Sequence, residues 1–162
     1  MHQDTQIVGV DPGLVHTGVV TLAFLPKMRQ VLTAHQVVQG LDAPAVAGVI
    51  DELCPQRGVP ASIYVEGYRS RGNLGHDKDM LIAVRDMVAA TKGKALDNTG
   101  VKKTVKPAVL QALGVWKFST PTHHDDLRSA ARIAVLGMLK EHNELLADVI
   151  RDYLDGRPWR VV

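Results

Sequence analysis

The feature that most constrains the fold is a short apolar run that ends in an acidic residue. Residues 7–20, IVGVDPGLVHTGVV, contain a β-like run that ends at Asp11, a turn through Pro12 and Gly13, and a second β-like run after Gly18. A carboxylate at the end of a buried strand is unfavourable unless a polar or positively charged group faces it. The pattern therefore predicts a strand, a tight turn and a second strand, with a partner group close to Asp11.

Length and composition indicate a globular protein. The chain has 162 residues, of which 46% are hydrophobic and 22% are charged, and this balance argues against disorder or a fibrous repeat. Such a length suits one compact core. We therefore assign residues 1–154 to a single domain and residues 155–162 to a C-terminal tail.

Cysteine usage and apolar runs bear on location. Cys54 is the only cysteine, which excludes an internal disulfide and a multi-cysteine zinc site and suits a reducing cytoplasm. The N-terminus lacks the pattern of a signal peptide, and the apolar runs are shorter than a membrane span. We expect a cytoplasmic protein without a membrane partner.

The order of the apolar patterns predicts an α/β fold. Strands are expected at 6–11, 18–25, 31–38, 62–67 and, as the weakest pattern, 95–101, and helices at 43–53, 76–91, 107–113, 124–141 and 143–154. Strands first, followed by alternating helices and strands, indicate a mixed five-stranded sheet. We expect this sheet to begin with a three-strand meander and to be flanked by helices on both faces. In such sheets, functional sites form at strand ends.

Further acidic positions are placed to join Asp11. Glu66 lies near the end of the strand-like run SIYVEG, and His123 and Asp126 lie three positions apart at the start of a helix, so that both project from one face. The small residues that follow in this helix permit a close approach to the sheet; they are Ser129, Ala130, Ala131 and Ala134. The sequence thus permits a pocket with three carboxylates and one imidazole.

Clustered carboxylates repel one another unless a counter-charge neutralises them, and a divalent metal ion would do so. Oxygen ligands favour Mg²⁺, with Mn²⁺ as a substitute, and two such ions about 4 Å apart position a nucleophilic water in phosphodiester cleavage. His123 would assist proton transfer or contact a metal ion. Simpler interpretations remain open: Asp11 as a turn former, Glu66 as a solvated strand end, Asp125 or Asp126 as a helix cap, and His123 as a surface residue.

Basic residues after Glu66 are candidates for nucleic-acid contact. Tyr68, Arg69 and Arg71 lie in the segment EGYRSRGN, whose glycines predict a flexible basic loop with one stackable ring. A mobile, solvated loop without a ligand is the alternative.

A second basic segment follows later in the chain. Between residues 92 and 106 there are five lysines and a single acid, Asp97. Within this segment Lys102, Lys103 and Lys106 are the candidates for phosphate contacts, with a solvated loop surface as the alternative.

With these residues in place, the chain resembles the RuvC family of Holliday junction resolvases within the RNase H-like nucleases. Its opening GVDPGLVHTGVV is similar to the first motif of that family, IYVEG to the second with its strand-terminal Glu, and HHDDLRSAARIA to the third, in which an HxxD pair opens the final core helix. The motifs follow the family order and span nearly the whole chain. The resemblance implies an RNase H-like fold and a metal-dependent endonuclease. Such an enzyme resolves four-way DNA junctions by paired hydrolysis and leaves 5′ phosphate and 3′ hydroxyl ends.

Carried over residue by residue, the resemblance implies Asp11, Glu66 and Asp126 as catalytic, metal-binding carboxylates and His123 as their catalytic partner. Asp125 is the alternative or fourth metal ligand.

The chain departs from cellular family members in two respects. Those members often carry two acids three positions apart in the last motif, whereas Arg128 lies three positions after Asp125 here. The family also carries an aromatic wedge shortly after the Glu, and Tyr68 stands near that position in an altered context. Phage-encoded members diverge in such ways, so we expect a phage-type member acting in a bacterial cell or a phage-infected host.

The resemblance also implies a homodimer, because family members are dimers and the helix after the Glu contributes to their interface. Met80, Val84, Met87 and Val88 would supply that surface, or would instead face the core of the chain itself. A two-fold dimer would present paired sites to a two-fold junction.

Other functions are kept as alternatives. The first is an RNase H-like nuclease that acts on flaps, forks or RNA-containing duplexes. A sugar kinase or actin-like ATPase shares the core fold, but needs two such domains, and 162 residues are too few for both. The last alternative is a DNA-binding module without catalysis.

Overall fold

A computed structural model describes residues 2–162, which form a six-stranded mixed sheet with the order β5-β4-β1-β2-β3-β6. The strands are β1 (Thr5–Asp11), β2 (His16–Leu25), β3 (Gln30–Gln39), β4 (Ala61–Glu66), β5 (Lys94–Leu96) and β6 (Arg160–Val161). The strands β1, β2 and β3 form an antiparallel meander. The outer pairings, β1 with β4, β4 with β5, and β3 with β6, are parallel.

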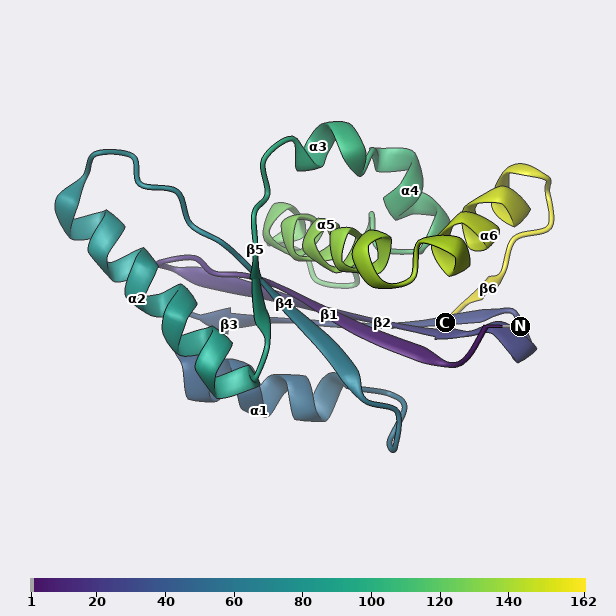
Figure 1. Cartoon of the computed structure of the whole chain (residues 1–162), viewed down its shortest axis with the longest axis horizontal. Helices are drawn as coiled ribbons and strands as arrows, with labels where there is room; N and C mark the ends of the chain where they lie inside the picture. Colours follow the sequence, from purple (N-terminus) through teal and green to yellow (C-terminus); the bar gives the residue numbers. More distant parts are fainter. Residues whose placement is uncertain (1) are drawn as a thin grey trace.

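Helices cover both faces of this sheet (Figure 1). They are α1 (Ala43–Leu53), α2 (Leu74–Thr91), α3 (Val101–Thr104), α4 (Pro107–Ala112), α5 (His124–Glu141) and α6 (Asn143–Leu154), with a 3-10 turn η1 (Pro26–Met28) between β2 and β3. The helices α1 and α2 lie on one face, and α5 lies on the other together with α3, α4 and α6. The three layers therefore bury the sheet from both sides.

The alternation of side chains along β1 assigns residues to the two faces. Ile7 belongs to the hydrophobic cluster under α5, whereas Val8 and Val10 belong to the cluster under α1 and α2, and all three are fully buried. By the same period of two, Gly9 and Asp11 share the face of Ile7. Asp11 therefore ends β1 on the face that α5 covers.

Glycines in the sheet let α5 approach unusually closely. A Cβ atom at Gly9 would lie 2.0 Å from the backbone oxygen of Ala130, and a Cβ atom at Gly18 would lie 2.6 Å from the backbone oxygen of Asp126. Gly18 is the cross-strand partner of Asp11. The start of α5 is thus held directly over the end of β1.

The α/β fold, the mixed sheet, the opening meander and the helices on both faces confirm the expectations from sequence. The helix at 43–53 begins as predicted, because the Asp42 side chain caps it by accepting a hydrogen bond from the Ala45 amide at 3.0 Å. The sheet of residues 2–162 has one strand more than the five expected, because β6 pairs with β3. This strand lies inside the segment assigned to a tail, where Trp159 is also buried. The weak strand expected at 95–101 is shorter, and α3 begins at Val101.

The apolar side chains of α2 that were candidates for a dimer surface face the core of the chain instead. Met80, Val84 and Met87 are buried within the chain, and Val88 packs against the cluster under α1 and α2. These side chains are therefore core residues and do not form an exposed interface. Among residues 2–162, no helix combines the length and the apolar character that crossing a bilayer requires.

The close contact between α5 and the sheet gives a prediction about stability. The substitution Gly9→Ala would place a methyl group 2.0 Å from the Ala130 oxygen and 2.6 Å from the Ala134 nitrogen, so backbone must shift. We expect the free energy of unfolding, measured by urea denaturation, to fall by about 3 kcal/mol or more. Gly48→Ala is the matched control, because a Cβ there meets no atom within 4 Å and lies in α1. That variant should gain about 0.5–1 kcal/mol, and equal effects of the two substitutions would contradict the close-packing account.

Candidate active site

Two acidic side chains meet where neighbouring parallel strands end. Val10 of β1 is in register with Val65 of β4, and each is followed by the acidic residue that ends its strand, Asp11 and Glu66. The period of two places both carboxyl groups on the face covered by α5. They lie close enough for a hydrogen bond between the two side chains.

The surroundings of Asp11 disfavour its ionised form. Burial raises the pKa of Asp11 most strongly, and the hydrogen bond to Glu66 and the negative charges of Glu66 and Asp126 raise it further, to about 9. The Asp11 carboxyl group therefore holds a proton at neutral pH when no cation is present. A positive charge in the same place would remove the need for that proton.

The first turn of α5 brings Asp126 and His123 to the same place. The His123 Nδ1 atom lies 3.4 Å from the Asp126 carboxylate, which confirms that the two side chains share one face of the helix start. His123 has a left-handed backbone conformation, with φ of 67°, at the residue that precedes α5. Asp126 is near enough for its charge to act on Asp11. The structure thus brings Asp11, Glu66, Asp126 and His123 together.

His16 is a neighbour that the sequence analysis missed. Its ring packs edge-on against the ring of His123, with the ring centres 4.0 Å apart. It lies two positions before Gly18 on β2, so the strand period, applied to this residue, would have indicated the face that α5 covers. The buried His16 Nδ1 atom has no hydrogen-bond partner among residues 2–162.

Asn98 is a second missed residue. Its side-chain amide donates a hydrogen bond to the Glu66 carboxylate from the turn that follows β5. The Asp97 carboxylate stabilises this turn by accepting hydrogen bonds from the Thr99 amide at 2.9 Å and from the Thr99 hydroxyl at 2.6 Å. An ion pair of 3.0 Å between Arg69 and Asp97 connects the turn to the segment after Glu66.

A cleft of about 460 Å³ opens beside Asp11 and Glu66. It is lined by the turn between β1 and β2, the segment after β4 and the start of α2, with Tyr68, Arg69, Arg71, His76 and Asn98 among the lining residues. The two predicted arginines and Tyr68 therefore do border the cleft that contains the two carboxyl groups.

The segment after Glu66 makes several contacts with the start of α2. The Tyr68 hydroxyl donates a hydrogen bond of 2.6 Å to Asp77, and the Tyr68 ring lies against the ring of His76, with centres 5.5 Å apart. Ser70 and the backbone at Arg71 also bind Asp77. The flexibility of this loop and the stacking of Tyr68 on a base stay predictions.

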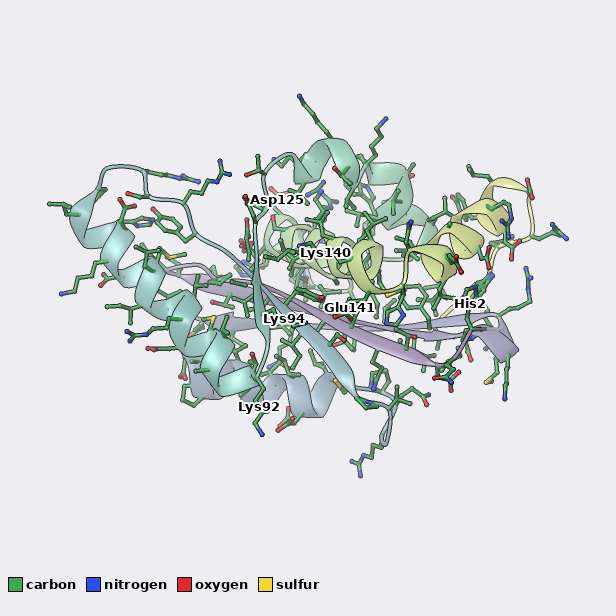
Figure 2. All side chains as sticks on the ribbon, in the orientation of Figure 1. His2, Lys92, Lys94, Asp125, Lys140 and Glu141 are labelled. Atoms are coloured by element: carbon green, nitrogen blue, oxygen red, sulfur yellow. The ribbon has the colours of Figure 1, made fainter. Side chains whose placement is uncertain are left out.

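Asp125 points away from the other acids. Its side chain is fully exposed and lies 3.5 Å from Arg128, whose guanidinium group stacks 4.0 Å above the Trp116 ring. Figure 2 shows Asp125 near the start of α5. Of the two adjacent acids, Asp126 is the one that acts on Asp11.

The lysine-rich segment divides into separate groups. Lys102 and Lys103 are exposed on α3, and Lys106 is exposed just before α4. Lys92 and Lys94 lie at the other end of β5 from Asp125 (Figure 2), and the positive charge of Lys94 acts on Glu141. Only the first group lies beyond the end of β5 at which Asn98 meets Glu66.

A larger cavity of about 800 Å³ lies at the opposite end of β1 and includes His2, Lys140 and Glu141 in its lining. The Glu141 carboxylate in this lining already has a donor, because the Tyr64 hydroxyl donates a hydrogen bond of 2.6 Å to it. Burial and this hydrogen bond raise the pKa of Tyr64 to about 12. We take the smaller cleft, where Asp11 faces the negative charge of Glu66, as the candidate active site.

The two acids in the cleft and Asp126 beside it suit a hard divalent cation in their chemistry. Asp11, Glu66 and Asp126 offer only oxygen atoms, and the proton that Asp11 holds stands where a positive charge would be favourable. Within residues 2–162, no group of three or more His, Cys, Asp or Glu side chains is gathered closely enough to coordinate one ion. Side-chain movement toward the ion would be needed to complete such a site.

The sheet order, with three antiparallel strands followed by parallel strands and with α5 over the strand-end acids, defines an RNase H-like fold. Neither a family model nor a curated protein sequence matches this chain. Solved structures do match, and three of them are Holliday junction enzymes or a complex of one.

Among the similar structures are two of RuvC and one of a yeast enzyme. Thermus thermophilus RuvC in complex with Holliday junction substrate has a TM-score of 0.58 and 17% identity, over 87% of this chain and 97% of that chain. Thermus thermophilus RuvC alone has a TM-score of 0.53 and 20% identity, over 86% and 97%. The yeast mitochondrial Holliday junction resolvase has a TM-score of 0.50 and 13% identity, over 91% and 85%. These similarities establish the fold.

The raised pKa of Asp11 gives a prediction about pH. Between its ordinary value of 3.8 and about 9, the folded chain binds more protons at Asp11 than the unfolded chain does, so stability falls as pH rises through this window. The slope reaches at most about 1.4 kcal/mol per pH unit. In chelator-treated protein, Asp11→Asn should therefore flatten the fall in the free energy of unfolding between pH 5 and pH 8.5. The exposed Asp4→Asn should leave it unchanged, and parallel curves for the parent and Asp11→Asn would contradict the assignment.

Proposed function

We propose that this protein is a metal-dependent endonuclease that resolves four-way DNA junctions. The observation that carries the proposal is the meeting of the Asp11 and Glu66 carboxyl groups at the ends of parallel strands, with the charge of Asp126 acting on Asp11 from α5. Buried carboxylates that destabilise one another in the free protein are characteristic of a cation site, because scaffold acids are normally paired with donors. The similarity in fold to RuvC bound to Holliday junction DNA supports the choice of substrate.

Asp11, Glu66 and Asp126 would hold Mg²⁺ or Mn²⁺, and two ions per site are expected by analogy with two-metal nucleases. Bound metal supplies a lowered pKa for the attacking water and neutralises charge at the phosphate. Asp125 would remain outside this group, because it is fully exposed and paired with Arg128.

Asn98 in the cleft and two histidines near Asp126 would orient these carboxylates and handle protons. The Asn98 amide holds one oxygen of Glu66, which leaves its other oxygen to face the cleft. His123 holds a position 3.4 Å from Asp126, from which an imidazole nitrogen accepts or returns a proton during hydrolysis. His16 packs against the His123 ring and limits its rotation.

Positive charge near the cleft would bind the DNA backbone. Arg69 and Arg71 line the cleft itself, and Lys102, Lys103 and Lys106 extend the basic surface over α3 and the start of α4. Phosphate contacts of this kind position a duplex without reading its sequence. We expect the branch point of the junction near the cleft and its arms over these basic residues.

Paired nicks require a homodimer, in which two clefts face a two-fold junction. The core positions of α2 are unavailable for that contact, but Leu74 and Leu81 of the same helix are exposed at 88% and 50%. These side chains are the apolar positions that an α2-centred dimer would bury.

The decisive experiment uses labelled four-way junction DNA. Asp11→Asn should reduce cleavage with Mg²⁺ by about a thousandfold or more, because a catalytic unit is lost. Junction affinity, measured by anisotropy in Ca²⁺, should stay within about twofold because the phosphate contacts remain. Asp4→Asn, an exposed carboxylate before β1, is the matched control and should cut like the parent. Unchanged cleavage by Asp11→Asn would refute the proposed site.

The same assay separates the alternative substrates. Symmetric paired nicks in the four-way junction support a resolvase. Preferred cutting of flaps, forks or RNA-containing duplexes would keep the metal site and replace the substrate. Junction binding without cutting in Mg²⁺ or Mn²⁺ would favour a DNA-binding module.

Metal binding has its own test without any DNA. Mg²⁺ at about ten times its Kd should stabilise the parent by about 1.4 kcal/mol, a rise in Tm of about 3–6 °C. Asp126→Asn should lose this rise, because it removes a proposed ligand. Asp125→Asn should keep it, because its side chain is fully exposed and faces Arg128. The reverse result would make Asp125 the ligand.

A further inference from the structure

Asp77 is a nearly buried acid whose hydrogen bonds converge on one loop. It lies in the first turn of α2 and is only 6% exposed. Its carboxylate accepts hydrogen bonds from the Tyr68 hydroxyl at 2.6 Å, the Ser70 hydroxyl at 2.7 Å, and the backbone amides of Arg71 at 3.1 Å and Gly72 at 3.0 Å. The loop concerned is the segment 67–73 between β4 and α2, which we call the cleft loop.

These contacts replace the water that a buried carboxylate loses. A buried charge is tolerated when hydrogen bonds satisfy its oxygens, and donors from four loop residues do so here. The same donors hold the pKa of Asp77 well below its ordinary value, so the group stays ionised. The backbone closes around it at Gly72, whose φ of +81° is one that glycine adopts without strain.

Every side-chain hydrogen bond of Asp77 within residues 2–162 goes to the cleft loop. None of them reaches the sheet or another helix. Loss of the carboxylate should therefore release the loop and leave the layers of the fold in place.

The cleft loop carries the cations of the candidate site. Arg69 is held to Asp97 across the cleft mouth, but Arg71 is exposed and has no acidic partner among residues 2–162. The backbone amide of Arg71 is one of the groups that Asp77 holds. Asp77 therefore fixes the backbone from which an unpaired guanidinium group extends beside the cleft.

We propose that Asp77 is a positioning residue for substrate binding: it holds the cleft loop in one conformation, so that Arg71 meets a DNA phosphate without a further ordering cost. The inference rests on the proposed function, because it takes the ligand of Arg71 to be DNA. It assigns to Asp77 a role in binding and none in the chemical step. A loop held in advance loses less conformational entropy when the substrate binds.

The test compares Asp77→Asn with Asp79→Asn, a change at an exposed acid of the same helix whose side chain makes no hydrogen bond within residues 2–162. For Asp77→Asn we expect about a tenfold rise in KM and in junction Kd, because hydrogen bonds to a charged group are lost, with kcat within about twofold. The slope of log Kd against log salt should fall by about one phosphate contact. Asp79→Asn should match the parent in each measurement.

A double-mutant cycle with Arg71→Gln shows whether Asp77 acts through Arg71. If it does, adding Asp77→Asn to Arg71→Gln should weaken binding much less than it weakens the parent. Full additivity of the two effects would overturn the positioning role, since a merely destabilised fold would also weaken binding through other contacts.

Limited trypsin digestion reports on the loop without DNA. Cleavage after Arg69 and Arg71, identified by mass spectrometry, should be faster in Asp77→Asn than in the parent, while Tm and circular dichroism show the fold intact. A variant that binds junctions and resists trypsin like the parent would overturn this inference and leave the nuclease proposal standing. A parent that binds no branched DNA would overturn both.

Discussion

The contact between α5 and the first two strands is the constraint on which the candidate site depends. Glycine at positions 9 and 18 removes the side chains that would otherwise separate the helix backbone from the sheet. The approach is so close that the Asp126 carbonyl lies over Gly18, the cross-strand partner of Asp11. An acid in the first turn of α5 is therefore delivered to the end of β1. With ordinary side chains beneath it, the helix would stand farther from the sheet and Asp126 would lie farther from Asp11.

Parallel pairing of β1 with β4 completes the arrangement. Because the two strands run in one direction and end in register, Asp11 and Glu66 emerge side by side on one face. The free protein then holds two carboxyl groups close together, and burial adds to the unfavourable interaction. Hydrophobic clusters on both faces of the sheet stabilise the fold. Their stabilisation offsets the unfavourable interaction between the two carboxyl groups.

Local sequence patterns predicted the site residues that lie at strand ends or on one helix face. They did not predict contacts between segments that are far apart in the sequence. The position of each acid at a strand end predicts the meeting of Asp11 and Glu66, and helix spacing predicts the pairing of His123 with Asp126. Asn98 reaches Glu66 only because β5 adds to the sheet edge and its turn folds back, a contact 32 residues apart in sequence. The tail assigned to 155–162 contains β6 for a similar reason, since its pairing with β3 spans most of the chain. Lysines that are neighbours in sequence separate because β5 runs between them.

Two aspartates of this protein show how environment divides one side-chain type between two tasks. Asp77 is surrounded by hydroxyl and amide donors, so its charge is satisfied within the chain and it orders the backbone around it. Asp11 faces Glu66 and Asp126 instead, so its charge is opposed by its neighbours and its pKa rises to about 9. A carboxylate that the protein already satisfies has little to gain from a cation, whereas one that the protein leaves in conflict gains most. The opposite directions of the two pKa shifts, together with the hydrogen-bond donors in contact, therefore distinguish Asp77, which orders the cleft loop, from Asp11, the proposed catalytic acid.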